Sequence, residues 1–470
     1  MAALRGLRPA PLADARVLEL GCGTGANLLP LALACPGATI IGCDLAESAT
    51  SFAGDVADEL GLDNIEFRHA DLASIDASWG DFDYIVCHDV FSWVAPRLRL
   101  KILEIQATRL AAQGVGYISY DALPGWHFHE AALGMMRYQA RPQSGFRETV
   151  DRARAVLAMA AEALDQESGV YASVLRDEHW LMSSIPDAHL YHLTSSAQHR
   201  AFYFHEFVQE VRAANLEWIG DAGGDRAEVT WPEATRTFLA QQPAEDRQQY
   251  LEFLNNRSFA RALLCRHDTQ RRGVFDPQVV EALWVGLTSC AVLEPTEAGG
   301  LCLSLNGRKA FRSNDIAIQR ALRRMESARP QLLPVSELFD AASSAPPGFL
   351  MQALATGALE AVLSPFNLTS RIEDRPMVSP LVRLEARAGR VVTNQKTEPV
   401  QLNGPMQFVL QRLDGKHDRT ALTGAIEAQM HAGELTADPD CPFARLRIPA
   451  AEIAAECLRQ ARRHALLVEH

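Results

Sequence analysis

Three glycines stand at alternate positions of one short run near the N-terminus. The run Glu19-Leu20-Gly21-Cys22-Gly23-Thr24-Gly25 follows an apolar stretch and precedes a helix-length segment. Glycine in such a turn lets the backbone approach a ligand without a clash from a Cβ atom. The spacing is shorter than the G-x-G-x-x-G run that binds a pyrophosphate at a helix N-terminus. The run therefore predicts a cofactor without a pyrophosphate, such as S-adenosylmethionine, against the alternative of a turn that needs glycine for steric reasons alone.

Two acids follow the next predicted strands and support the same cofactor. Asp44 ends the second strand, where its carboxylate can accept hydrogen bonds from both ribose hydroxyls. NAD enzymes also have an acid at this place, so Asp44 alone does not distinguish the two cofactors. Asp71 follows the third strand and can accept the adenine amino group, although by itself it also suits a helix N-cap. The predicted cofactor-binding residues are Glu19, Gly21, Cys22, Gly23, Asn27, Asp44, Leu45, Asp71, Leu72 and His88.

The fourth predicted strand leads into the segment from His88 to Pro96, at the edge of the sheet where open α/β folds bind ligands. Methyl transfer from a sulfonium is an in-line displacement, so it depends on positioning and on a dry, polarisable wall. Aromatic rings can supply that wall, and a His or Asp side chain can move a proton. The alternative is that these side chains only pack in the structure. The aromatic candidates are Phe91, Trp93, Tyr120 and Trp126. The predicted catalytic residues are His88, Asp89, Trp93 and Tyr120.

Short apolar or β-branched runs alternate with helix-length amphipathic segments from Arg16 to Tyr120, which predicts an α/β fold with a Rossmann-like parallel sheet. The predicted strands are Val17–Leu20, Thr39–Cys43, Ile65–Arg68, Tyr84–Cys87 and Val115–Tyr120. A crossover helix is predicted at Arg97–Ala112, with Gly114 as its stop.

Beyond this core the pattern changes to long helical segments. We expect a cofactor core over 14–122, a helical insertion over 126–200 and a returning segment over 201–267, which together form a domain of residues 1–267. In the returning segment, Leu216–Ile219 reads as a strand and Ser258–Cys265 as a run that rejoins the sheet. Residues 268–470 are expected to form a mainly helical domain with strands at Leu301–Leu305 and Gly389–Thr393.

Composition narrows the function classes. The 470 residues are 48% hydrophobic and 22% charged, as in ordinary globular proteins of several domains. A formal charge of -13 repels phosphate backbones, so we expect no nucleic acid partner. The nine cysteines form no C-x-x-C pair and no metal site, which favours a reducing cytoplasmic location. The sequence has no long uninterrupted apolar stretch, so we expect that the protein is neither exported nor inserted into a membrane.

The sequence resembles a group of bacterial methyltransferases that includes protein-lysine methyltransferases acting on outer-membrane proteins. The cofactor turn carries the resemblance, together with the following runs: Asp83-Tyr84-Ile85-Val86, Ser92-Trp93-Val94-Ala95-Pro96, the segment 114–126, Tyr203-Phe204-His205-Glu206-Phe207, Tyr250-Leu251-Glu252-Phe253 and Leu263-Leu264-Cys265. The later runs are similar to the family's methyltransferase regulatory domain. Ser379-Pro380-Leu381, Val392-Thr393-Asn394 and Leu413-Asp414-Gly415 resemble its C-terminal winged-helix-like domain.

The resemblance implies methyl transfer from S-adenosylmethionine to lysine side chains of a protein substrate. The sequence departs from the family at three places: Asp89 stands where the family has Gly, Phe91 where it has Tyr and Asp121 where it has Asn. It also begins about one helix before the cofactor turn, whereas relatives carry a longer lead. The three substitutions predict an altered acceptor pocket. If the longer lead closes over the cofactor in relatives, the short one predicts an open or incomplete cofactor site, and a wrongly assigned start codon is the alternative.

Three alternatives to protein-lysine methylation stay open. A small-molecule methyltransferase would use the segment 127–197 as a lid, and a regulatory protein would bind S-adenosylmethionine without turnover. An NAD-dependent oxidoreductase is the third. A homodimer is a further expectation that the sequence leaves open.

Overall fold

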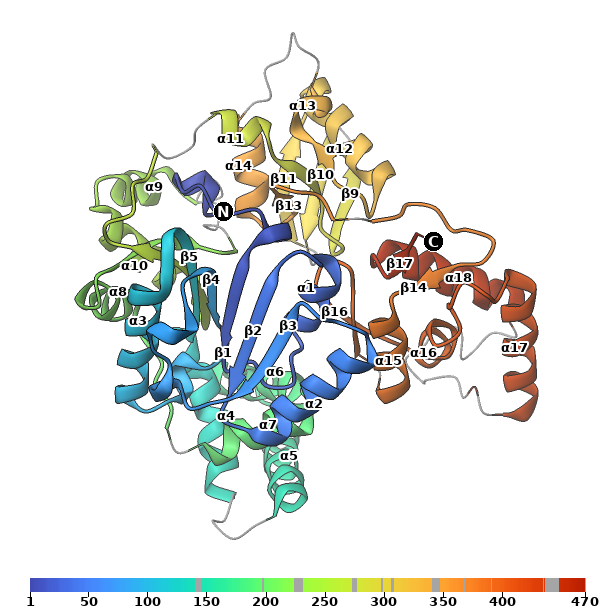
Figure 1. Cartoon of the computed structure of the whole chain (residues 1–470), viewed down its shortest axis with the longest axis horizontal. Coiled ribbons are helices and arrows are strands. Elements are labelled where there is room, and N and C mark those ends of the chain that lie inside the picture. The colour runs from blue at the N-terminus through green and yellow to red at the C-terminus, as the bar shows by residue number, and fades with distance from the viewer. Residues whose placement is uncertain are drawn as a thin grey trace.

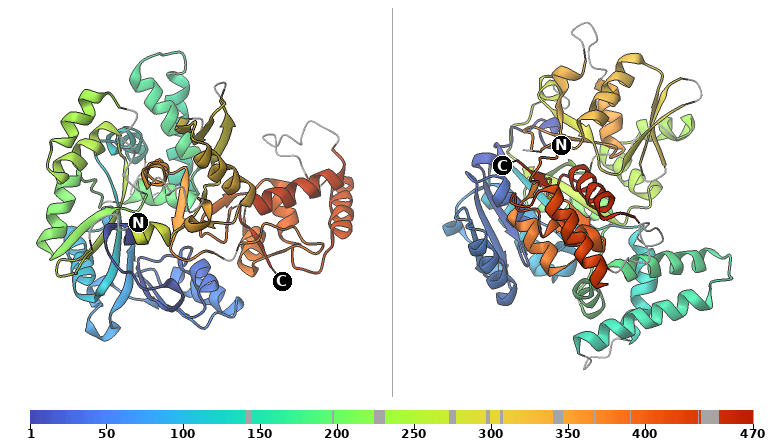
Figure 2. Two further views of the ribbon diagram at one scale, coloured as in Figure 1. Left: turned by 90° about the horizontal axis from the view of Figure 1, so that it is seen from above. Right: turned by 90° about the vertical axis from the view of Figure 1, so that its right-hand side faces the viewer.

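The computed structural model describes residues 1–139, 145–196, 198–223, 231–272, 277–296, 299–305, 308–339, 347–366, 368–389, 391–433, 435 and 448–469. A sheet lies at the centre, a helical unit and a mixed α/β unit lie on opposite sides of it, and a C-terminal helical unit lies beside it (Figures 1 and 2).

The central sheet has seven strands in the order β3-β2-β1-β4-β5-β7-β6. Its strands are β1 Arg16–Leu20, β2 Thr39–Asp44, β3 Ile65–His69, β4 Phe82–Cys87, β5 Leu110–Asp121, β6 Leu216–Asp221 and β7 Phe259–Arg266. The pairs from β3 to β5 are parallel, whereas β7 runs antiparallel to both β5 and β6. The strands predicted at 17–120 are confirmed, and so are the returning strands at 216–219 and 258–265.

Helices cover both faces of the sheet because neighbouring strand residues point to opposite sides. Val17 packs with Leu28 of α1, whereas Leu18 packs with Ile102 of α3 and Phe207 of α8. These helices are α1 Leu28–Ala34, α2 Glu47–Glu59, α3 Pro96–Arg109 and α8 Phe204–Ala213. The glycine turn after β1 and the acids after β2 and β3 therefore lie along the same edge of the sheet.

The predicted end of the crossover helix is wrong. Helix α3 ends at Arg109, and β5 begins at once with Leu110, so Gly114 lies inside a strand and stops no helix. Leu110 is fully buried and pairs with Phe82 across the parallel ladder. Burial of Leu110 in the sheet core overrides the helical spacing that continued through it.

The predicted helical insertion consists of α4 Trp126–Gln139, α5 Phe146–Ala163, α6 Val170–Ser184 and α7 Asp187–Ser195. These helices share one hydrophobic cluster that also contains Trp93 from the edge of the sheet. Residues 140–144 and 197 of the insertion lie outside the described part of the chain. Helices α9 Glu233–Ala240 and α10 Ala244–Leu254 lie between β6 and β7 in the sequence.

Residues from 277 onward form two separate hydrophobic clusters rather than the single expected core. The predicted strands at 301–305 and within 389–393 are present as β10 Leu301–Leu305 and β15 Val391–Thr393, and residue 390 lies outside the described part. The first cluster joins α11 Pro277–Glu281, β8 Trp284–Leu287, β9 Ala291–Pro295, β10 Leu301–Leu305, β11 Arg308–Ser313, α12 Ile316–Ala328, β12 Leu333–Pro334, α13 Val335–Leu338, α14 Pro347–Ala355 and β13 Leu359–Val362.

The second cluster builds the C-terminal unit seen beside the sheet (Figure 1). Its elements are β14 Met377–Val378, α15 Pro380–Ala388, β15 Val391–Thr393, β16 Pro399–Gln401, α16 Gly404–Leu410, α17 Arg419–Ala432, α18 Ala450–Arg463 and β17 Leu467–Val468. Leu381 of α15 packs with Val56 of α2, so this unit contacts the cofactor half of the molecule.

Candidate active site

The turn after β1 holds its three glycines in left-handed backbone conformations, with φ of 75° at Gly21, 52° at Gly23 and 78° at Gly25. A Cβ atom on Gly21 would lie 2.4 Å from Cγ2 of Val90, and one on Gly25 would lie 2.7 Å from Cζ of Phe67. A Cβ atom on Gly23 would meet nothing within 4 Å. Gly21 and Gly25 are therefore needed for packing, whereas Gly23 leaves open space where a cofactor can approach the backbone.

Glu19 is buried beneath this turn with one oxygen unsatisfied. Its side chain is 1% exposed, and Nδ2 of Asn27 donates a hydrogen bond to Oε1 across 2.7 Å. Oε2 is buried and has no hydrogen-bond partner among the described residues. Burial raises the pKa of Glu19 to about 7. Because buried polar atoms are normally paired, this oxygen fits a site that receives a cationic donor, and the amino group of S-adenosylmethionine is one.

Asp44 ties the end of β2 to the glycine turn. Its Oδ2 accepts a hydrogen bond of 2.9 Å from the Gly23 N–H, and its Oδ1 accepts one of 2.9 Å from the Ala46 N–H. Each carboxylate oxygen keeps a further lone pair for a ribose hydroxyl. The neighbouring Leu45 is 68% exposed, so its apolar side chain is available to an adenine ring.

Asp71, Leu72 and Cys22 have clear structural roles. Asp71 caps the 3-10 turn Leu72–Ser74, where its Oδ1 accepts a 2.9 Å hydrogen bond from Ala73 N–H. Leu72 packs against the core of the sheet. Cys22 is buried, and its N–H donates to the carbonyl of Cys43 across 3.0 Å. The capping alternative for Asp71 therefore holds, and its exposed side chain keeps Oδ2 as a candidate partner for adenine.

His88 follows the end of β4, and its side chain makes two polar contacts. Its Nδ1 is 3.1 Å from Oη of Tyr117 and 3.2 Å from Oγ of Ser119, and burial lowers the pKa of the imidazole. The next residue, Asp89, has a φ of 56° and donates its N–H to Oγ of Ser119 across 2.7 Å. A left-handed backbone favours glycine, and Asp is among the other residues that tolerate it.

A cavity of about 840 Å³ borders His88 on one face of the sheet. Its lining includes the polar side chains of Asn27, His88, Tyr117 and Arg261, residues from the segments 1–12 and 361–366, and apolar side chains of the sheet such as Val86, Val115 and Leu263. The cavity thus connects the glycine turn with the first hydrophobic unit of the C-terminal half.

Trp93 lies in a cluster of rings that contains the expected Trp126 and also His192 and His199, which the sequence did not predict. Its ring centroid is 4.3 Å from that of His199, 5.0 Å from that of His192 and 6.1 Å from that of Trp126. Nε2 of His199 lies 3.0 Å from Oδ2 of the buried Asp121. Burial raises the pKa of Asp121, and the hydrogen bond from His199 opposes that shift. We name Trp93, Trp126, His199 and Asp121 the acceptor cluster.

The far side of the acceptor cluster contains a second imidazole and carboxylate pair. The ring of Trp126 lies 4.9 Å from that of His129, whose Nδ1 is 2.8 Å from Oε2 of Glu178. Nε1 of Trp126 is buried without a hydrogen-bond partner among the described residues. The acceptor cluster and the neighbouring pair of His129 and Glu178 together contain two indole rings, two imidazoles that contact carboxylates, and a buried indole N–H with no partner among the described residues.

Tyr120 and Phe91 lie elsewhere. Tyr120 is 3% exposed, and its ring stacks on that of Phe207 with 4.1 Å between the ring centroids. The ring centroids of Phe91 and Phe202 are 5.5 Å apart. Both belong to the core beneath α3 and α8, whereas Trp93 belongs to the cluster of the helical insertion. The structure therefore does not bring Tyr120 together with Trp93, and it places Asp121, the next residue of β5, in that position. Adjacent residues of a strand point to opposite faces.

These features define a class. A parallel sheet that is extended by the antiparallel strand β7, with a glycine turn after β1 and an acid after β2, is the cofactor domain of a class I S-adenosylmethionine-dependent methyltransferase. A family model for a methyltransferase domain matches residues 17–114. The model named "Predicted methyltransferase regulatory domain" matches residues 186–266, and the model "PKMT, C-terminal winged helix domain" matches residues 374–466.

Relatives and solved structures agree with this class. An uncharacterised protein of Rickettsia prowazekii is 29% identical over 473 residues, covering 93% of this chain and 83% of the relative. A second one from the same species is 31% identical over 209 residues, covering 44% of this chain and 84% of the relative. The structure of PKMT2 from Rickettsia typhi in complex with AdoHcy matches with a TM-score of 0.84 at 22% identity, covering 100% of this chain and 96% of that one.

The chain therefore belongs to the S-adenosylmethionine-dependent methyltransferases that carry this regulatory domain and this winged-helix domain. Its cofactor is S-adenosylmethionine. Within the described ranges, no helix is long and apolar enough to cross a membrane.

Proposed function

We propose that this methyltransferase modifies lysine side chains of a protein, with the acceptor cluster as the site of the reacting amine. The pairing of His199 with Asp121 beside Trp93 is the observation that carries the proposal. It lies at the edge of the sheet where β4 leads into the segment after His88. The PKMT-type winged-helix domain and the likeness to PKMT2 support a protein as substrate.

The acceptor cluster has the groups that this reaction needs. S-adenosylmethionine supplies an electrophilic methyl group on a sulfonium. A lysine ammonium must first lose a proton, and then its nitrogen lone pair can form the N–C bond as the C–S bond breaks. An ionised Asp121 accepts a hydrogen bond from Nε2–H of His199, which leaves Nδ1 of His199 with the lone pair that can accept the proton.

The surrounding side chains position the amine. The indole faces of Trp93 and Trp126 attract a cationic amine before it loses its proton and exclude water from the reacting atoms. His192 borders Trp93 and is exposed, so the cluster has one side open to an incoming side chain. Glu19, Gly23, Asp44 and Leu45 are the residues that we propose hold the cofactor, with Asp71 and His88 at its margins.

A radiolabel experiment tests this function. The purified protein is incubated with methyl-labelled S-adenosylmethionine and bacterial outer-membrane and cytoplasmic protein fractions, and labelled proteins are digested for mass spectrometry. We expect methyl groups on lysine Nζ. Failure to label any protein, or labels confined to other atoms, would contradict the proposal. The test variant for the acceptor cluster is Trp93→Ala. Its control is Trp180→Ala, because Trp180 is 75% exposed on α6.

The cavity beside His88 supports a second candidate, a small-molecule methyltransferase. Its volume of about 840 Å³ is large enough for a small acceptor. Label that passes into the small-molecule fraction of a cell extract, with no labelled protein, would favour this candidate. Cofactor binding without any transfer would favour the regulatory alternative. A homodimer and a cytoplasmic location stay predictions.

A further inference from the structure

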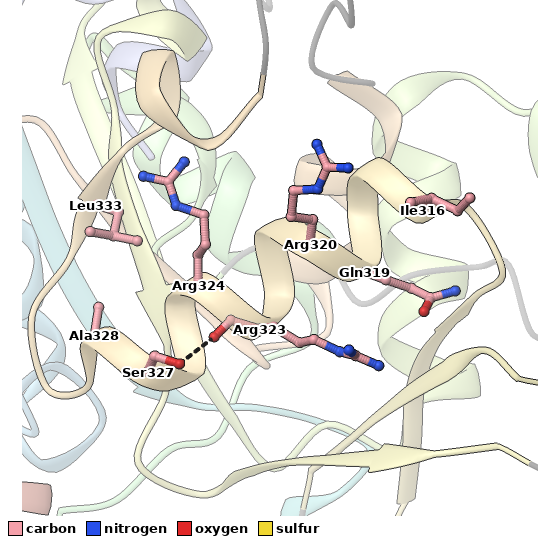
Figure 3. Close-up of a pocket in the computed structure, with 8 residues that line it drawn as sticks. All are labelled: Ile316, Gln319, Arg320, Arg323, Arg324, Ser327, Ala328 and Leu333. Atoms are coloured by element: carbon pink, nitrogen blue, oxygen red, sulfur yellow. Dashed lines mark hydrogen bonds between the residues drawn. The ribbon is translucent and has the colours of Figure 1, made fainter.

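Helix α12 carries a row of arginines on the side away from its core. Its buried face consists of Ile318, Ala321, Leu322 and Met325. Arg320, Arg323 and Arg324 are three and four positions apart on the exposed side, a spacing that places side chains next to one another on a helix. Figure 3 shows Arg320 and Arg324 extended from the same side of α12, with Arg323 in the neighbouring row.

These arginines line a groove of about 590 Å³. The groove is also lined by Ile316, Gln319, Ser327, Ala328 and Leu333. Ile316 is 73% exposed, so the groove presents an apolar side chain next to the guanidinium groups. Its lining contains no aromatic ring among the described residues.

Neither Arg323 nor Arg324 forms an ion pair with a carboxylate of α12. Glu326 of α12 pairs instead with Arg329 across 2.9 Å, and Asp315 caps the helix through the N–H groups of Ala317 and Ile318. Arg324 donates a hydrogen bond to the backbone carbonyl of Glu337. No carboxylate of the described residues forms an ion pair with Arg323 or Arg324. In a chain with a formal charge of -13, this groove concentrates the opposite sign.

We propose that the α12 groove binds an acidic segment of the protein substrate, one in which Asp or Glu alternates with aliphatic residues. This proposal rests on the proposed function. Guanidinium groups bind carboxylates through paired hydrogen bonds, and Ile316 and Leu333 provide contacts for aliphatic side chains. Single-stranded nucleic acid is a poorer fit, because its bases stack on aromatic rings that the groove lacks.

The groove lies away from the acceptor cluster. Helix α12 belongs to the unit on one side of the sheet, and the helical insertion that contributes Trp126 lies on the opposite side (Figures 1 and 2). Binding in the groove therefore adds affinity for a long substrate without contact with the reacting atoms. Loss of the groove should raise KM for the protein substrate and leave kcat unchanged.

A peptide-binding experiment tests the groove without relying on methyl transfer. A fluorescent short peptide of alternating Glu and Leu is titrated with the full-length protein and followed by anisotropy. The test variant is Arg323→Glu with Arg324→Glu. The control is Arg147→Glu with Arg387→Glu, which reverses two exposed arginines outside the groove and gives the same net charge. Calorimetric binding of S-adenosylmethionine checks that both variants are folded.

We expect the peptide to bind the wild-type protein and the control, and its affinity for the test variant to fall on the order of tenfold or more. KM for the methylated protein should rise by a similar factor in the test variant alone. Equal binding to both variants, equal binding of a Lys-Leu peptide, or tighter binding of oligothymidylate would overturn the proposal. Selective peptide binding without methyl transfer to any protein would instead contradict the proposed function and leave the groove as a peptide site.

Discussion

Asp121 accepts a hydrogen bond from His199 across 3.0 Å, although 78 positions separate the two residues. The contact forms because the chain returns from the helical insertion alongside the end of β5, where Ala122 and Phe202 make an isolated bridge. This hydrogen bond joins the end of β5 to the segment that matches the regulatory domain, residues 186–266. The proposed acceptor cluster is therefore shared between the two.

The variant His199→Ala should lose turnover and keep the cofactor. If Nδ1 of His199 accepts the proton of the amine, its removal should lower kcat by about a hundredfold or more. His199 does not contact the glycine turn, so Kd for S-adenosylmethionine should change little. Single-turnover rates with the labelled protein substrate, together with calorimetry, measure the two quantities.

The matched control for this variant is His267→Ala, because the side chain of His267 is 72% exposed at the end of β7. Asp121→Asn is a second variant, which keeps the shape of the side chain and an oxygen that can accept the hydrogen bond from His199, so it should lose less turnover than His199→Ala. A normal kcat for His199→Ala would show that the ring only packs against Trp93. A lower kcat in His267→Ala would point to a general effect on the fold.

Cofactor affinity should depend on pH through Glu19. The pKa of this carboxyl is raised to about 7, so it is mostly neutral below that pH and ionised above it. A cationic amino group binds the ionised form better. Kd for S-adenosylmethionine should therefore fall several-fold from about pH 6 to about pH 7.5, below the pH at which the amino group of the cofactor loses its own proton.

The variant Glu19→Gln removes the titrating group at nearly constant volume. Its Kd should change little over the same pH range and should be close to the acid-side value of the wild-type protein. A wild-type Kd that does not vary with pH would contradict the role of Oε2 as the partner of the cofactor.

Gly23→Val should abolish cofactor binding with little loss of stability. The open space next to Gly23 would be filled by the new side chain, and the φ of 52° costs a branched residue ~1–2 kcal/mol. Gly433→Val is a close control, because Gly433 has a φ of 68°, a Cβ atom there would meet nothing within 4 Å, and it is far from the site in sequence. Asp44→Ala should weaken binding as well, since it removes the acceptor for the ribose hydroxyls.

Calorimetric titration and thermal melting separate the two effects. Both glycine variants should melt a few degrees below the wild-type protein, and only Gly23→Val should fail to bind S-adenosylmethionine. Retained affinity in Gly23→Val and in Asp44→Ala would overturn the assignment of the cofactor site.

Local patterns in the sequence were enough to predict the cofactor half. Each strand from β1 to β4 is a short apolar run that ends near a glycine, an acid or a histidine, so its end and its ligand groups could be identified together. The short strands β8, β9, β11 and β13 were not predicted, because four to six residues with mixed polarity give no clear period. No sequence pattern marks the Arg323-Arg324 pair, since only the fold shows that it borders a groove.

The acceptor cluster could be predicted only in part. Trp93 and Trp126 stand next to strand ends and were identified as candidates for that reason. His192 and His199 come from the end of the helical insertion, and no local spacing relates them to β5. Tyr120 was chosen for its position at the end of β5, but the alternation of side chains along the strand turns it into the core and turns Asp121 toward His199.

The role of Trp93 provides the sharpest test of the acceptor cluster. Trp93→Ala removes a ring that contacts both His192 and His199, and Trp93→Phe keeps an aromatic wall of smaller area. We expect kcat/KM to fall on the order of tenfold or more in Trp93→Ala and less in Trp93→Phe, because the amine loses a cation–π contact and a fixed wall. Kd for S-adenosylmethionine should be unchanged in both variants, and Trp180→Ala should behave as the wild-type protein. Since a buried tryptophan also stabilises the fold, melting temperatures must be compared. Normal turnover in a folded Trp93→Ala would assign Trp93 to packing and would move the acceptor site to the cavity beside His88.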